Sequence, residues 1–108
     1  MITNNKDMVS EILTVMKQVK DPEIGLNVVD LGLIYQVDID EEINELYVNM
    51  TLTTQFCPMG ESIINAVKRV LEHDLNFKQV KVSITFDPPW NSEMITEEGE
   101  RFLNKNDA

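Results

Sequence analysis

The residue best suited to chemistry in this sequence is Cys57, the single cysteine among 108 residues. It follows the polar run Thr53-Thr54-Gln55 and stands directly before Pro58, where an apolar helical pattern begins. A helix N-terminus presents unpaired backbone N–H groups and the positive end of the helix dipole, and both stabilise a thiolate. The thiolate is the form of cysteine that binds metals and attacks electrophiles. The alternative is a small buried cysteine, but the polar surroundings favour a functional thiol and make Cys57 the candidate metal ligand.

Two groups of residues could act with this thiol. They are carboxylates at positions 21 to 30 and two threonines just before Cys57. Asp21, Glu23 and Asp30 could be general bases, hard-metal ligands or partner contacts. From spacing alone the simpler interpretation is structural, because Asp favours turns and accepts backbone N–H bonds there. Thr53 and Thr54 fit an ordinary strand, although either could donate a hydrogen bond to the thiolate. No C-x-x-C, H-E-x-x-H or glycine-rich phosphate motif is present in the sequence.

The only histidine is not expected to activate the thiol. His73 lies 16 residues after Cys57 along one predicted helix. At 1.5 Å of rise per residue, the two side chains are roughly 24 Å apart. A general base must lie within hydrogen-bond distance of its nucleophile, so a Cys–His pair is excluded on this geometry.

The apolar periodicity predicts elements in the order helix, strand, strand, helix, strand, short helix. Helices are expected over about 5–20, from the cysteine to about 71, and from 92 to 103, and strands over 31–39, 46–53 and 80–86. The sequence therefore predicts a single α+β domain of two layers, with a mixed sheet of about three strands and helices on one face.

The connections between these elements predict where distant segments meet. A short polar turn makes the first two strands an antiparallel hairpin, and a helical crossover makes the second and third strands parallel. The start of the first strand and the ends of the other two then lie at one edge of the sheet. This arrangement brings together the Cys57 segment, the run Asp21 to Asp30, and Asp87-Pro88-Pro89-Trp90.

Three sequence blocks occur in an order that resembles the SufT/PaaD-like family of iron–sulfur cluster assembly factors. The first is Asp-Pro-Glu-Ile-Gly-Leu-Asn-Val-Val-Asp-Leu-Gly-Leu-Ile-Tyr at 21–35. The second runs from Met50-Thr51-Leu52-Thr53 to Cys57-Pro58-Met59-Gly60, and the third from Val82 to Trp90. Each block is weak alone, and the three together span most of the chain. The length is similar to the short stand-alone bacterial form of the family.

The resemblance implies a non-enzymatic auxiliary role in maturing iron–sulfur proteins, and a fold like the C-terminal domain of NifU scaffolds. By position it makes Cys57 the reactive cysteine, and it places Asp21, Glu23, Asp30 and Thr53 in the motif blocks. The NifU domain carries paired cysteines that this chain lacks. Because a cluster usually takes four cysteine ligands, any iron or cluster is expected to be transient, and shared between chains of a homodimer or with a client. Expected partners are iron–sulfur carriers or client proteins.

The charge and the lone cysteine limit the other partners and the compartment. With 19 acidic and 9 basic residues the net charge is −10, which disfavours nucleic acids and anionic membrane surfaces. The sequence has no apolar run near the roughly 20 residues that span a bilayer. A single cysteine suits a reducing compartment, so a cytoplasmic location is expected.

Two other functions stay open at this point. One is a thiol-dependent enzyme that uses Cys57 as nucleophile and Asp21 or Glu23 as base. The other is a protein adaptor whose acidic surface delivers clients to the cluster machinery while the cysteine is incidental. An enzyme should turn over a small substrate without iron, and an adaptor should keep its function without the thiol.

We expect Cys57 to react with iodoacetamide at neutral pH faster than an ordinary exposed cysteine, because the helix N-terminus lowers its pKa. The measurement is the alkylation rate against pH, for the wild type and for Asp21→Asn, Glu23→Gln and Asp87→Asn. A pKa that falls only in one of these variants identifies the carboxylate that restrains the thiol. An apparent pKa at or above that of free cysteine in all four proteins contradicts the expectation.

Overall fold

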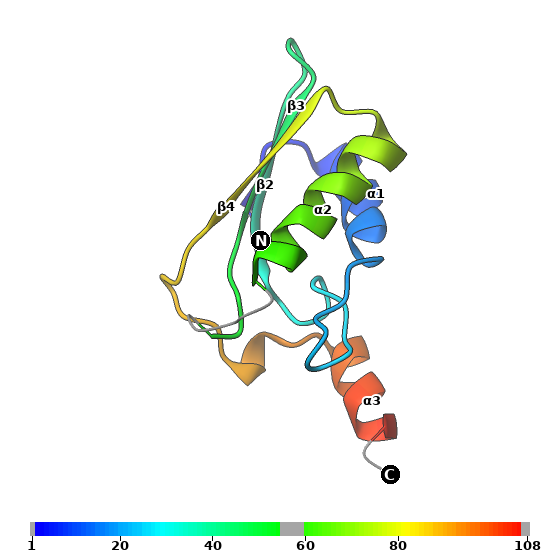
Figure 1. The fold of residues 1–108 in the computed structure, drawn as a ribbon, viewed down its shortest axis with the longest axis vertical. Helices are drawn as coiled ribbons and strands as arrows, with labels where there is room; N and C mark the ends of the chain where they lie inside the picture. Colours follow the sequence, from blue (N-terminus) through cyan, green and yellow to red (C-terminus); the bar gives the residue numbers. More distant parts are fainter. Residues whose placement is uncertain (1, 55–59, 107–108) are drawn as a thin grey trace.

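The computed structural model describes residues 2–54 and 60–106, which form an α+β domain of two layers. A four-stranded sheet makes one layer, and helices α1 and α2 cover one of its faces (Figure 1). A 3-10 turn, η1, and a last helix, α3, lie beyond one end of the sheet. The elements are β1 (Ile2–Thr3), α1 (Lys6–Met16), β2 (Ile34–Asp40), β3 (Glu45–Met50), α2 (Gly60–Leu75), β4 (Gln79–Ile84), η1 (Ser92–Met94) and α3 (Glu97–Asn106).

The strand order β1-β2-β3-β4 confirms the predicted hairpin and crossover. β2 and β3 are antiparallel, and β3 and β4 are parallel. The sheet has four strands where three were expected, because Ile2–Thr3 pairs in parallel with Gln36 and Val37. A strand of two residues is too short to show an alternating pattern in the sequence. The Asn4 side chain extends this pairing, since it accepts from the Ile39 N–H at 2.8 Å and donates to the Ile39 carbonyl at 2.9 Å.

The first predicted strand begins later than expected, at Ile34 instead of residue 31. The register between β2 and β3 shifts by one residue at this point, because Ile34 faces Met50 while Gln36 faces Asn49. Tyr35 is therefore the extra residue of a bulge. The bulge explains why Ile34 and Val37 are both buried, although they are three residues apart in a strand whose side chains alternate between faces.

The first helix starts as predicted but ends early. The Asn5 side chain caps it by accepting from the Asp7 and Met8 N–H groups, both at 3.2 Å. α1 stops at Met16, short of the predicted residue 20. The chain that follows turns into a small hairpin, in which Lys20 forms an antiparallel bridge with Asn27. Lys20 needs an extended backbone for that pairing, so the helix could not continue to residue 20.

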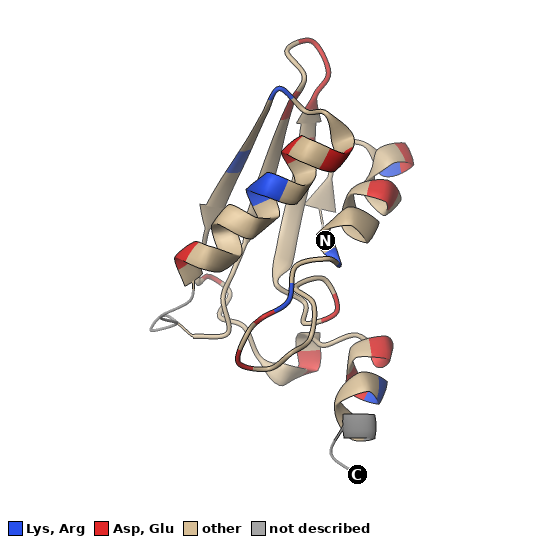
Figure 2. Cartoon of the chain, turned by 45° about the vertical axis from the view of Figure 1, so that its right-hand side comes forward, with Lys and Arg blue, Asp and Glu red and all other residues tan. Residues whose placement is uncertain are grey.

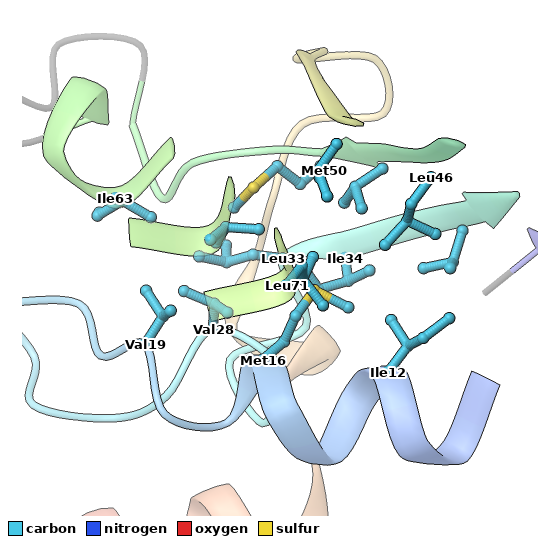
Figure 3. Packing of buried hydrophobic residues seen from close by; sticks show 14 of the residues in the cluster. Ile12, Met16, Val19, Val28, Leu33, Ile34, Leu46, Met50, Ile63 and Leu71 are labelled. Carbon is cyan, nitrogen blue, oxygen red and sulfur yellow. The ribbon is translucent and has the colours of Figure 1, made fainter. Parts of the chain in front are cut away.

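The hydrophobic core lies between the sheet and the two helices (Figure 3). α1 contributes Ile12 and Met16, which are fully buried, and the stripe predicted on α2 supplies its buried residues. None of the described helices has the length and apolar character that crossing a bilayer requires. The buried apolar residues of the helices and the sheet include Ile12, Met16, Val37, Leu46, Val48, Met50, Ile63, Val67, Leu71 and Val80.

Alanine substitution of the two glycines with positive φ is expected to lower stability by different amounts. Gly25 (φ +81°) has open space around it. Gly25→Ala should therefore lower the free energy of unfolding only by the backbone cost of a positive φ, about 1–2 kcal/mol. Gly32 (φ +80°) lies against the backbone of Met94, and an added Cβ would collide with that carbonyl. Gly32→Ala should therefore lose at least about 2 kcal/mol more. Urea unfolding of both variants measures the difference, and equal losses would contradict the close packing of η1 on this turn.

Candidate functional site

One end of the sheet gathers the segments that the sequence singled out. We call it the site edge, where β2 begins and β3 and β4 end (Figure 1). Met50 of β3 faces Ile34 on one side and Ile84 on the other. The Thr51 N–H donates to the Leu33 carbonyl at 2.8 Å, so the pairing continues past β3. This placement confirms the predicted meeting of the three strand ends.

The segment after β4 crosses the site edge and is held by two side chains. The Trp90 Nε1–H donates to the Leu31 carbonyl at 2.6 Å. The Tyr35 hydroxyl donates to the Pro88 carbonyl at 2.9 Å. The third sequence block is thereby fixed against the first, as the topology predicted. Trp90 is half-buried against the core, which agrees with a packing role. The Asp87–Pro88 peptide bond in the same segment is cis.

Cys57 lies in 55–59, outside the described residues, and its role as a functional thiol stays a prediction. The described residues that flank this stretch are Thr53, which is half-buried, Thr54, which is exposed, and Gly60. A Cβ on Gly60 would lie 2.8 Å from the Leu52 Cδ1 atom. Leu52, two residues after β3, therefore lies close to Gly60 at the start of α2.

Asp21 closes a turn with its carboxylate and backbone. It is 2% exposed, and its Oδ1 atom accepts from the N–H groups of Glu23 at 2.8 Å and Ile24 at 3.2 Å. Its carbonyl accepts from the Gly25 N–H at 2.8 Å. A buried carboxylate needs such donors, and here the turn supplies them. Glu23 is exposed in the same turn. The Asp21 carboxylate therefore stabilises a turn within the small hairpin that follows α1.

Asp30 connects the first motif block to the last helix. Its Oδ2 atom accepts from Asn27 Nδ2 at 2.7 Å, and its Oδ1 atom accepts from the Thr96 hydroxyl at 2.8 Å. The Thr96 N–H donates to the Asp30 carbonyl at 2.9 Å. Thr96 Oγ1 also accepts from the Gly99 N–H at 3.0 Å, which caps α3. The Oδ1 atom and the carbonyl of Asp30 therefore dock the start of α3, while its Oδ2 atom closes the local turn with Asn27.

Sequence reasoning missed three of the residues that organise the site edge. Asn27, Tyr35 and Thr96 were not among the candidates, although each holds a segment in place. Thr96 carries the signal that was available, since a threonine followed by two glutamates is typical of a helix start. The last helix was instead expected to begin at residue 92, which belongs to the separate turn η1.

His73 lies at the C-terminal end of α2, away from the site edge, as predicted. It is exposed, and its Nδ1 atom is 2.9 Å from Asp74 Oδ1. Hydrogen bonds from His73 and then from Gln18 hold the pKa of Asp74 below its usual value. Among residues 2–54 and 60–106, no three His, Cys, Asp or Glu side chains come together as a metal site. Within the described part of the chain, His73 therefore lies away from the site edge.

Comparison with known proteins places the chain in a family. The model of the iron–sulfur cluster assembly protein family matches residues 10–84. The chain belongs to this family. The match spans the predicted site residues from Asp21 to Cys57, and it ends before Trp90 and Thr96. The resemblance drawn from the three blocks is thereby confirmed.

Relatives in the family are similar over most of their length. The Fe-S protein maturation auxiliary factor of Porphyromonas gingivalis is 42% identical over 97 residues, which cover 88% of this chain and 91% of that protein. The Fe-S protein maturation auxiliary factor SufT of Staphylococcus aureus is 44% identical over 76 residues, covering 70% and 85%. A domain of unknown function, DUF59, from Bacillus anthracis superposes with a TM-score of 0.86 at 31% identity, covering 92% and 93%. The α+β architecture is therefore that of the family.

The turn at Asp21 predicts different results for two substitutions. Asp21→Asn keeps an oxygen at the Oδ1 position that can accept from the Glu23 and Ile24 N–H groups, so stability should change little. Asp21→Ala leaves both N–H donors unpaired and should lower the free energy of unfolding by about 1–2 kcal/mol. Thermal or urea unfolding measures both. An Asp21→Asn variant as unstable as Asp21→Ala would show that the negative charge, and not the acceptor geometry, matters.

Proposed function

We propose that this protein is an auxiliary factor in iron–sulfur cluster assembly, and that it helps mature iron–sulfur proteins through the thiol of Cys57. The observation that carries the proposal is the family match over residues 10–84, together with relatives named as Fe-S protein maturation auxiliary factors. Those relatives cover most of this chain, so the role is carried by the domain described above. The protein acts in the cytoplasm, where a lone cysteine stays reduced.

In this proposal the iron or cluster is cargo, and the chain supplies only part of its ligand set. Cys57 provides one thiolate, whereas a cluster usually takes four cysteine ligands. The remaining ligands come from a carrier, from a client protein, or from Cys57 of a second copy. A relative from Synechocystis named iron-sulfur cluster carrier protein, 30% identical over 78 residues, supports the link to cluster transfer.

The contacts of the two buried aspartates support a non-enzymatic role over a thiol enzyme. Asp21 Oδ1 holds two backbone N–H groups, and both oxygens of Asp30 accept hydrogen bonds. A carboxylate engaged in this way is a poor general base, because taking up a proton would break the bonds that keep its turn closed. His73 is exposed at the far end of α2, and the exposed Glu23 is the carboxylate left to the rival mechanism.

We expect a strain that lacks this protein to lose activity of an iron–sulfur dehydratase, most strongly when demand for clusters is high. Wild-type protein should restore the activity, and Cys57→Ala should fail to restore it while keeping a normal melting temperature. The measurement is dehydratase activity in extracts, with the level of each variant checked by immunoblot. Normal dehydratase activity in the deletion strain at both low and high demand contradicts the proposal.

A matched control separates the thiol from general damage to the surface. His73→Ala changes an exposed side chain at the opposite end of α2 and should complement fully. Full complementation by Cys57→Ala would favour a protein adaptor that does not need the thiol. Turnover of a small substrate by purified protein without iron would favour the thiol enzyme.

A further inference from the structure

β4 is the last strand of the sheet, and its outer edge is without a partner among the described residues. Figure 1 shows it along one margin of the molecule, with α2 over its face and no element beside its edge. The pairing with β3 is continuous from Gln79 to Ile84, without a bulge. Proteins commonly protect such an edge with a lysine, a proline, a bulge or a covering segment, because an open edge pairs with other strands. The described part of β4 has no proline, bulge or covering segment, and its one lysine, Lys81, is paired with Glu45 of β3.

The hydrogen-bond pattern shows which backbone groups face outward. Thr85 donates its N–H to the Met50 carbonyl at 2.9 Å, so the odd-numbered residues of β4 bond to β3. In a ladder, alternate residues direct both backbone groups to opposite sides. Val80, Val82 and Ile84 therefore direct their N–H and C=O groups to the free edge. Val80 is fully buried, whereas Val82 and Ile84 are half-buried, so these two offer the accessible groups.

A second copy of β4 fits these groups in one antiparallel register, with the two-fold axis between the two Ser83 residues. Val82 of one copy then faces Ile84 of the other, and four backbone hydrogen bonds form. The half-buried apolar side chains of Val82 and Ile84 cover each other on the helix side of the sheet. On the open side Ser83 faces Ser83, and Lys81 faces Thr85. The register places no like charges opposite each other.

The charge of β4 also favours a second copy. The chain carries a net charge of −10, so two copies repel each other over most of their surfaces. Residues 75–86 contain Lys78 and Lys81 but no carboxylate, and Figure 2 shows no acidic residue along β4. Lys81 is paired with Glu45 at 3.3 Å and lies 5.5 Å from the ring centre of Tyr47. The positive charge of Lys81 is therefore already paired with a carboxylate of the same chain. This pairing weakens the attraction of Lys81 for an acidic peptide of another protein.

We infer that two copies of this chain pair through β4, so that one continuous sheet runs through a symmetric dimer. The inference rests on the proposed function, in which two copies of the chain can share a cluster. The pairing itself uses backbone and side-chain groups on β4 and needs no iron. Oligomeric state is therefore measured on metal-free protein, and its outcome is separate from the outcome of the complementation experiment.

The test is a disulfide cross-link that forms only in the inferred register. In a Cys57→Ser background, Ser83→Cys places two thiols opposite each other across the two-fold axis, with Cα atoms about 4.5 Å apart. Lys81→Cys is the matched control, because Lys81 is also exposed on the same face of β4. Its two copies would be four residues out of register, roughly 13 Å apart, which is too far for a disulfide. Both variants are oxidised with oxidised glutathione and compared on non-reducing gels.

We expect Ser83→Cys to form a covalent dimer at least tenfold faster than Lys81→Cys. Sedimentation velocity of wild-type protein should show a concentration-dependent monomer–dimer equilibrium. Val82→Pro removes an outward N–H without touching the ladder to β3, and it should shift that equilibrium to monomer. Equal cross-linking of the two cysteine variants overturns the inferred register. Wild-type protein that stays monomeric up to its solubility limit overturns the dimer and leaves the edge to a strand of another protein.

Discussion

The α2 crossover is the constraint on which the arrangement of this protein depends. A helix that leaves β3 and returns to β4 makes the two strands parallel, so both end on the same side of the sheet. The hairpin between β2 and β3 makes β2 begin there as well. Three segments that are far apart in sequence must therefore meet at the site edge. The hydrogen bonds of Trp90 and Tyr35 then fix the last segment against the first.

Polar groups in this small domain stabilise turns and helix starts, which limits what they can do chemically. Asp21 is buried with its turn N–H groups, and Asp30 is divided between Asn27 and Thr96. Burying a carboxylate is costly unless donors surround it, so these residues are committed to the fold. The two buried aspartates of the first motif block therefore have a structural role in these contacts. Cys57, in the second block, stays the predicted functional thiol.

In the proposed function and the inferred dimer, the thiol of Cys57 and the edge of β4 have a feature in common, because each would supply part of an interaction that a second chain would complete. One thiolate is a fraction of a cluster ligand set, and one strand edge is half of a strand pair. Such a chain suits transfer of cargo between proteins, since incomplete ligation keeps the cargo exchangeable. A carrier that supplied every ligand itself would hold a cluster more tightly and release it more slowly.

The sequence by itself determined the fold class, the order of the main elements and the meeting of the strand ends, because periodicity and connection length constrain topology strongly. The family followed from the resemblance of three sequence blocks. It also placed the start of the first helix near residue 5 and His73 at the far end of α2. Only the tertiary structure decided the short strand β1, the bulge at Tyr35, the early end of α1 and the docking of α3 by Asp30 and Thr96. Most of these depend on a partner distant in sequence, such as the Asn4–Ile39 and Asp30–Thr96 pairs, whereas the early end of α1 depends on the nearby Lys20–Asn27 bridge. Local patterns do not contain that information, because a backbone group accepts any partner that the fold brings within hydrogen-bond distance.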